Sequence, residues 1–197
     1  MTTVVIENSN YKEELRQKTS KPLLWIALIS IIMFFRGLTS AVIVSQGGGG
    51  FINIKLPFAF TISTIIIVLS SATFYYGLFS IKKGKIEAAK ISISLTLLLG
   101  LLFILSQFLG WSNLYQKGVY AVGNQSTQQS SYLYLLTVLH VAHLIGGLIS
   151  LLVVLVKTIK GKYSSTNFLG VQVSITYWHF LGGLWIYLFL FLKFIIV

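Results

Sequence analysis

The sequence predicts an all-α membrane protein, a bundle of five transmembrane helices with its N-terminus inside and its C-terminus outside. Five apolar runs each have at least the roughly 20 residues that a helix needs to cross about 30 Å of hydrocarbon. The positively charged residues gather in alternate connections between these runs. Because the buried helices of a water-soluble domain would be shorter and apolar on one side, we expect the runs to span a membrane.

The five runs divide the chain simply. Residues 1–22 are expected to form a cytoplasmic N-terminal tail, and residues 23–197 a five-helix transmembrane domain. The expected spans are about 23–45, 56–81, 90–111, 131–156 and 168–194. Apart from Lys90 and Lys193 at their edges, Arg36 is the only formally charged residue in these spans.

Each span has its own boundary signals. Seven charged residues precede the first span. This span is too long for a signal peptide and lacks a small-residue cleavage site, so we expect the span to be retained in the mature protein. The second span begins beside Pro57, which the first turn of a helix tolerates. The third follows a lysine-rich loop, the fourth a polar connection at about 113–131, and the fifth a second lysine-rich loop.

Lysine and arginine outnumber aspartate and glutamate by 15 to 4, and their placement indicates the topology. The tail, the 82–90 loop and the 157–162 loop hold eleven positive residues, whereas the opposite connections and the C-terminus hold three. Because cytoplasmic loops carry the excess of Lys and Arg, we expect the N-terminus inside. Nucleic acid is not an expected partner, since no basic stretch is interleaved with exposed aromatics.

Histidines inside the spans are candidates for function, because hydrocarbon offers a polar group no partner. His140 and His143 share one stripe of the fourth span with Gly147, and His179 lies in the fifth. His143 and His179 could supply one haem pair. A copper or zinc site would need more ligands, yet the spans contain no acid and the chain no cysteine. We therefore expect structural hydrogen bonds, and no catalytic, cofactor-binding or metal-binding residue.

Arg36 lies about fourteen residues into the first span, where an unpaired arginine costs about 2.5–3.5 kcal/mol on insertion scales. A lipid phosphate, backbone carbonyls or hydroxyls, or a carboxylate of a neighbouring subunit could compensate it. Snorkelling of the side chain to the outer surface is the alternative. The Ser, Thr and Gly residues that share helix faces are expected to let helices pack closely.

Several segments resemble, in order, the helices of a known family. The last helix of that family is resembled by residues 177–180, Trp185 and residues 186–189. The helix before it has a two-histidine signature, which residues 136–137 and 139–147 resemble. Weaker matches precede them at residues 99–103 with Gln107, at Ser70-Ser71, and at Ser30, Phe34-Phe35 and Gly37. On these motifs, residues 23–197 resemble subunit III of haem–copper respiratory oxidases, chiefly bacterial cytochrome c oxidases, in a short form of five helices.

The resemblance implies a subunit without redox centres in the bacterial cytoplasmic (inner) membrane. Its implied partners are oxidase subunits I and II, phospholipids and a larger respiratory supercomplex. Subunits I and II would hold the haem and copper and carry out O2 reduction coupled to proton translocation. The implied role is to support assembly, lipid binding and stability of subunit I. Candidate contacts with lipid or other subunits are Arg36, His140, His143, Trp178 and His179.

Two other functions are possible for a chain of this kind, and three of its residues differ from the pattern of the family that it resembles. A five-helix b-type cytochrome and a small membrane transporter are the alternative functions. Many relatives carry acids at three positions that are here Ile31, Gly110 and Gly182. A role that needs a carboxylate inside the membrane is therefore not expected of this chain.

Overall fold

The computed structural model describes residues 2–46, 56–124, 126–163 and 168–196, and over these residues the chain is helical without any strand. The elements are α1 (Thr2–Gln46), α2 (Phe58–Lys82), α3 (Ile86–Gln116), α4 (Gln128–Ile159), α5 (Leu169–Phe191) and a final π-helical turn, η1 (Leu192–Ile196). Each α-helix contains a stretch long and apolar enough to cross a membrane. The predicted bundle of five transmembrane helices is thereby confirmed.

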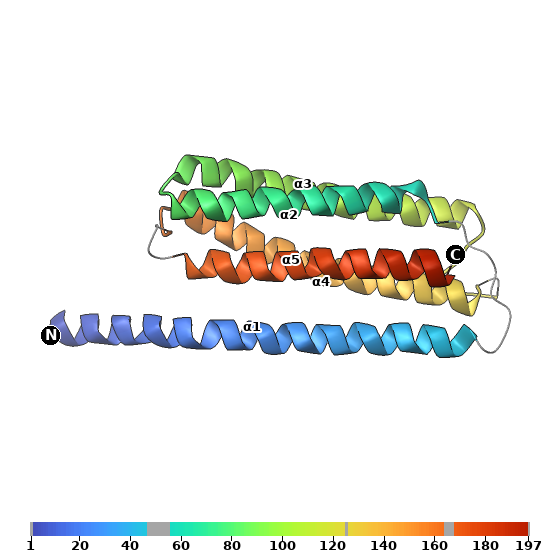
Figure 1. Cartoon of the computed structure of the whole chain (residues 1–197), viewed down its shortest axis with the longest axis horizontal. Coiled ribbons are helices and arrows are strands. Elements are labelled where there is room, and N and C mark those ends of the chain that lie inside the picture. The colour runs from blue at the N-terminus through green and yellow to red at the C-terminus, as the bar shows by residue number, and fades with distance from the viewer. Residues whose placement is uncertain (1, 47–55, 125, 164–167, 197) are drawn as a thin grey trace.

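Four of the helices form a ring, and the fifth lies outside it. α2 packs against α3 and α5, and α4 closes the ring by packing against α3 and α5. α1 packs against α5 and, less extensively, against α4, so it stands at the edge of the bundle (Figure 1). α1 begins and η1 ends at opposite ends of the bundle (Figure 1). The distribution of lysine and arginine predicts that the end where α1 begins is cytoplasmic.

α1 is longer than its membrane-spanning part. The helix has 45 residues, about 67 Å at 1.5 Å per residue, whereas its apolar stretch is Thr19–Ser45. Pro22 lies inside the helix, where its ring removes one backbone hydrogen bond. Part of the segment expected as a tail therefore continues the first span as a helix beyond the bundle (Figure 1).

Tight turns close the two lysine-rich connections. Gly84 follows α2 with φ 73°, and Gly161 follows α4 with φ 65°. In the first turn, the Lys85 amide donates to the Ser80 carbonyl at 2.9 Å, and in the second, the Lys162 amide donates to the Lys157 carbonyl at 3.0 Å. Glycine adopts this left-handed conformation without steric cost, so α2 and α4 each end sharply at these turns.

The connection between α3 and α4 is fastened to the start of α4. Thr127 and Ser130 form a capping box, in which each side chain bonds the backbone amide of the other. The Ser130 and Ser131 hydroxyls donate to the Tyr120 and Ala121 carbonyls, each at 2.7 Å. The polar sequence of this connection therefore covers one end of the bundle.

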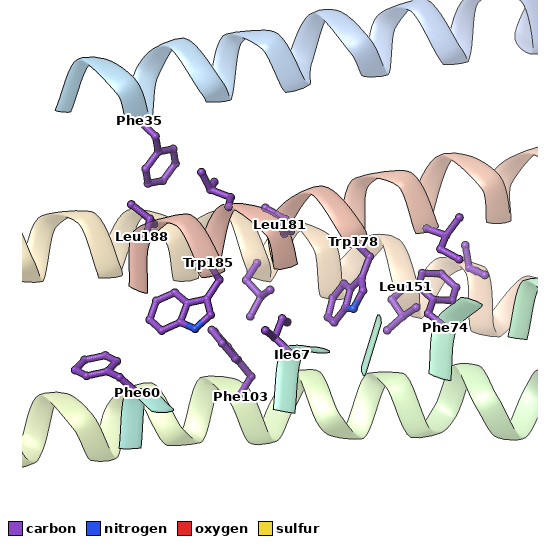
Figure 2. Packing of buried hydrophobic residues seen from close by; sticks show 14 of the residues in the cluster. Phe35, Phe60, Ile67, Phe74, Phe103, Leu151, Trp178, Leu181, Trp185 and Leu188 are labelled. Carbon is purple, nitrogen blue, oxygen red and sulfur yellow. The ribbon is translucent and has the colours of Figure 1, made fainter. Parts of the chain in front are cut away.

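The core of the ring is aromatic and is built around glycines. Trp178 and Trp185 of α5 are the largest fully buried side chains, and Figure 2 shows both pointing from α5 into the bundle. Gly100 lies so close to Trp178 that a Cβ there would be 2.7 Å from the indole Cη2. At Gly147 a Cβ would be 2.9 Å from Leu181 Cδ1 and 3.3 Å from Trp178 Cε3. The expectation that small residues let the helices approach is thus confirmed at both positions.

Side-chain hydrogen bonds join every neighbouring pair of helices in the ring. They link Thr73 to Thr96 (α2–α3), Trp178 to Ser70 and Trp185 to Thr64 (α5–α2), Trp111 to Thr137 (α3–α4), and Ser150 to Ser174 (α4–α5). The hydroxyls that accept from the tryptophans also donate to a carbonyl of their own preceding turn. A hydroxyl can do both at once, so these bonds use polar groups that hydrocarbon would leave unsatisfied.

Candidate functional site

His140 lies in an aromatic cluster at the centre of the ring. Its side chain is fully buried on α4, and its ring centroid lies 5.1 Å from Trp185 of α5 and 5.9 Å from Phe103 of α3. Phe103 meets Trp185 edge to face at 5.1 Å, and Phe60 of α2 lies on the other side of the indole at 6.0 Å. Figure 2 shows Trp185 between Phe60 and Phe103. Side chains of α3 and α5 therefore pack directly against His140, and Phe60 of α2 extends the cluster through Trp185.

His143, one turn further along α4, faces α1 and α5. Its Nδ1 lies 2.7 Å from the Leu139 carbonyl oxygen, which requires the tautomer with the proton on Nδ1. Phe35 of α1 packs against the imidazole with a centroid separation of 5.6 Å, and the Tyr177 hydroxyl of α5 donates to the His143 carbonyl at 3.1 Å. The residue thus helps to hold α1 onto the ring.

His179 occupies a different surface from the other two histidines, and it is exposed on α5. Among the described residues, no three His, Cys, Asp or Glu side chains gather into a group that could hold a metal ion. The three histidines therefore have separate surroundings: an aromatic core for His140, the contact with α1 for His143, and the outer face of α5 for His179.

Arg36 lines a groove between α1 and α5. The groove has a volume of about 570 Å³. Its lining residues are Ile32, Phe35, Arg36, Phe180, Gly183, Leu184 and Tyr187. Beside it, the Thr39 and Tyr187 hydroxyls are 3.0 Å apart and bond α1 to α5. The one ion pair found in the described part of the chain joins Lys90 to Glu87, so no carboxylate there neutralises Arg36.

Comparison with known proteins identifies the family. The model of the cytochrome c oxidase subunit III family matches residues 25–196. The chain belongs to this family. It is 31% identical over 172 residues to cytochrome c oxidase subunit 3 of Corynebacterium diphtheriae, covering 83% of this chain and 82% of that protein. It is also 31% identical over 179 residues to a probable cytochrome c oxidase subunit 3 of Mycobacterium bovis, covering 88% and 85%.

Family membership confirms the resemblance found in the sequence. The chain is subunit III of a haem–copper oxidase, a component of an enzyme complex, and a multi-pass protein of the bacterial cytoplasmic membrane. A relative from Alkalihalophilus pseudofirmus, also a cytochrome c oxidase subunit 3, is 32% identical over 132 residues, which is 65% of this chain and 61% of that protein. The b-type cytochrome and the transporter are not favoured.

The structure separates the five candidate contact residues into two groups. Arg36 and His179 are exposed, and His143 is partly exposed, so these side chains can meet a lipid or another subunit. His140 and Trp178 are 0% and 1% exposed and lie inside the ring. Direct contact with lipid or a neighbouring subunit does not fit these two residues. Their packing instead sets how closely α3, α4 and α5 approach one another.

Two of the positions at which the family resemblance led us to look for acids, Gly110 and Gly182, are closed by neighbouring side chains. A Cβ at Gly110 would be 3.2 Å from the Phe60 ring, and a Cβ at Gly182 would be 3.2 Å from the Ser71 hydroxyl. Both distances are shorter than ordinary van der Waals contacts, so neither site has room for a carboxylate without movement of its neighbours. The glycines here are part of the packing.

Sequence reasoning did not single out Trp185 as a site residue, although it lies at the centre of the aromatic cluster. Its indole N–H donates to the Thr64 hydroxyl at 3.0 Å, and its ring contacts Phe60, Phe103 and His140. A tryptophan near the middle of an apolar span was the available signal, because a buried indole N–H needs a partner on another helix.

Proposed function

We propose that this subunit III contains no redox centre and supports an oxidase whose haem and copper are held by subunits I and II. The match of the family model to residues 25–196 carries the proposal. The surroundings of the histidines support it: His140 lies among aromatic rings in the core, His143 contacts Phe35 of α1, and His179 is exposed on α5. These separate surroundings do not favour a haem shared by two of the histidines.

Co-purification tests this proposal. The full-length chain, tagged and isolated gently from its native membrane, should bring down subunits I and II together with haem and copper. The chain separated from those subunits should show no haem absorption and no stoichiometric copper. A b-type haem spectrum in the separated chain would contradict the proposal and favour the cytochrome alternative.

The orientation belongs to the same proposal. Residues 1–22 would form a tail on the cytoplasmic side and residues 23–197 the membrane domain, with the C-terminus outside. The lysines at both glycine turns, Lys82, Lys83 and Lys85 after α2 and Lys160 and Lys162 after α4, support this orientation. An anionic cytoplasmic leaflet attracts lysines near its surface, by about 1 kcal/mol for each.

We further propose that the groove between α1 and α5 holds a phospholipid, with its phosphate on Arg36 and an acyl chain along the apolar wall. Ile32, Phe35 and Leu184 give that wall, and Arg36 is the one cation among the lining residues. A planar guanidinium forms paired hydrogen bonds with phosphate oxygens. An amphiphile with one anionic end therefore matches the chemistry of the groove.

The matched variants Arg36→Leu and Arg36→Lys test the lipid proposal. Native mass spectrometry or lipid extraction of the purified oxidase should find fewer phospholipids per complex in Arg36→Leu, whereas Arg36→Lys keeps the positive charge and should retain more of them. Unchanged lipid content in both variants would favour snorkelling of Arg36. Unchanged lipid together with loss of the chain from the complex would indicate a carboxylate of a partner subunit.

A further inference from the structure

Gln107 of α3 and His140 of α4 are buried polar side chains without partners. Both are 0% exposed. The Gln107 Oε1 and Nε2 atoms and both His140 ring nitrogens have no hydrogen-bond partner among the described residues. Other buried hydroxyls, such as those of Ser70 and Thr137, donate to a carbonyl and accept from an indole. Since buried polar atoms in proteins are almost always bonded, these two side chains require an explanation.

Two contacts between α3 and α4, one on each side of Gln107, indicate that Gln107 and His140 lie on the same seam. The Phe103 ring lies 5.9 Å from the His140 ring, and the Trp111 indole donates to the Thr137 hydroxyl at 3.1 Å. Gln107 lies one turn after Phe103 and one turn before Trp111 on α3. Thr137 lies one turn before His140 on α4. Side chains three or four residues apart share a helix face, so Gln107 faces α4 at the level between Thr137 and His140.

The surroundings of the seam limit what can satisfy these atoms. Trp185 uses its indole N–H on Thr64, and Phe103 has no hydrogen-bonding group. Because Gln107 and His140 have no exposed surface, a lipid headgroup or a partner subunit cannot reach them. An amide left unpaired in an apolar setting destabilises the folded protein. The partner must therefore be small enough to enter the packed seam.

We propose that Gln107 and His140 form a buried water site between α3 and α4. A neutral imidazole has one N–H and one bare nitrogen, and a primary amide has two N–H donors and one carbonyl acceptor. One water molecule donates a hydrogen to the bare nitrogen of His140 and accepts one from the Gln107 amide. Its second hydrogen can go to the Gln107 carbonyl oxygen or to another water. Buried waters typically make two to four such bonds to groups that are otherwise unsatisfied.

The site is polar on one side and aromatic on the other. The rings of Phe103 and Trp185 pack around His140 and exclude lipid, while Gln107 supplies an amide with both donors and an acceptor. This arrangement distinguishes His140 from His143, whose Nδ1 already bonds the Leu139 carbonyl. The two histidines of the fourth span therefore have different roles, one hydrated inside the ring and the other bonded to its own helix.

Water-edited solid-state NMR of the chain labelled with ¹⁵N-histidine tests the proposal. The full-length chain is measured with its native partners in lipid. His143→Asn and His179→Gln each remove one signal, so the remaining signal is assigned to His140 without altering His140 itself. We expect magnetisation from water to reach the His140 ring nitrogens, and a nitrogen shift typical of a hydrogen-bonded imidazole.

The variant Gln107→Leu tests whether the water near His140 is held by Gln107 or reaches His140 by another route. We expect this variant to lose the transfer from water to His140, whereas the matched control Gln172→Leu on α5 should retain it. Absence of transfer to His140 in the unmodified chain would overturn the proposal, and so would a direct coupling between its ring and the Gln107 amide. Transfer that persists unchanged in Gln107→Leu would overturn the role of Gln107.

Discussion

Gly100→Ala tests whether Trp178 sets the spacing of the helices in the ring. A Cβ at position 100 would lie 2.7 Å from Trp178 Cη2 and from Leu148 Cδ2, roughly 1 Å closer than the usual separation of nonbonded carbons. Trp178 is 1% exposed, and its indole N–H donates to the Ser70 hydroxyl at 3.1 Å. The ring can therefore make room only if it leaves this hydrogen bond or pushes α3 away from α5.

The size of the effect follows from these two contacts. Overpacking a core costs about 1–3 kcal/mol, and losing the indole hydrogen bond adds about 0.5–1.5 kcal/mol. We expect Gly100→Ala to lower the free energy of unfolding by about 2–4 kcal/mol. Gly147→Ala should cost less, about 1–2 kcal/mol, since its shortest contact is with the flexible end of Leu181.

Gly146→Ala is the matched control for both variants. It lies beside Gly147 on α4, but a Cβ there would contact the Tyr177 hydroxyl at 3.6 Å, an ordinary van der Waals distance. The measurement is reversible unfolding of the purified chain in dodecyl maltoside by added SDS, followed through tryptophan fluorescence. Equal unfolding midpoints for Gly100→Ala and Gly146→Ala would refute the argument that Trp178 is held tightly between the helices.

Three further predictions concern topology and the contacts of α5. A reporter fused after Val197 should be active outside and one in the 82–90 loop inside, and the reverse pattern would overturn the orientation. Tyr187→Phe removes the bond to Thr39 and should loosen α1 by about 1 kcal/mol, measured as faster proteolysis of α1 in the assembled complex. Trp185→Phe removes the donor to a Thr hydroxyl and part of the core, and should cost about 2–4 kcal/mol in the same SDS titration. A midpoint unchanged by Trp185→Phe would mean that the aromatic cluster contributes little to stability.

The fold could be predicted from the sequence because its signal is length and hydropathy. Each apolar run had to be a helix, since a helix bonds its own backbone groups inside the bilayer. α1 also contains the charged residues before residue 23, with Pro22 among them, and hydropathy does not predict a helix in such a segment.

The surroundings of individual residues were harder to predict. Lipid is as apolar as a protein core, so a face that meets hydrocarbon and a face that meets another helix have the same composition. Trp178 and His140 were expected to contact lipid or another subunit; Trp178 lies between glycines in the core, and His140 lies among aromatic rings. Glycine positions were the better guide, because a close helix approach needs them on the facing side.

The two parts of the bundle differ in how they are held together, and the difference bears on the role of the subunit. Hydrogen bonds to buried hydroxyls join each neighbouring pair within the α2–α5 ring, whereas α1 is attached through the Phe35–His143 ring contact and the Thr39–Tyr187 bond. Most large apolar side chains of α1 are exposed. An element with few internal contacts adjusts its position at small cost. The groove that contains Arg36 lies along this less extensively bonded boundary, so a phospholipid bound there, as we propose, would add contacts between α1 and α5.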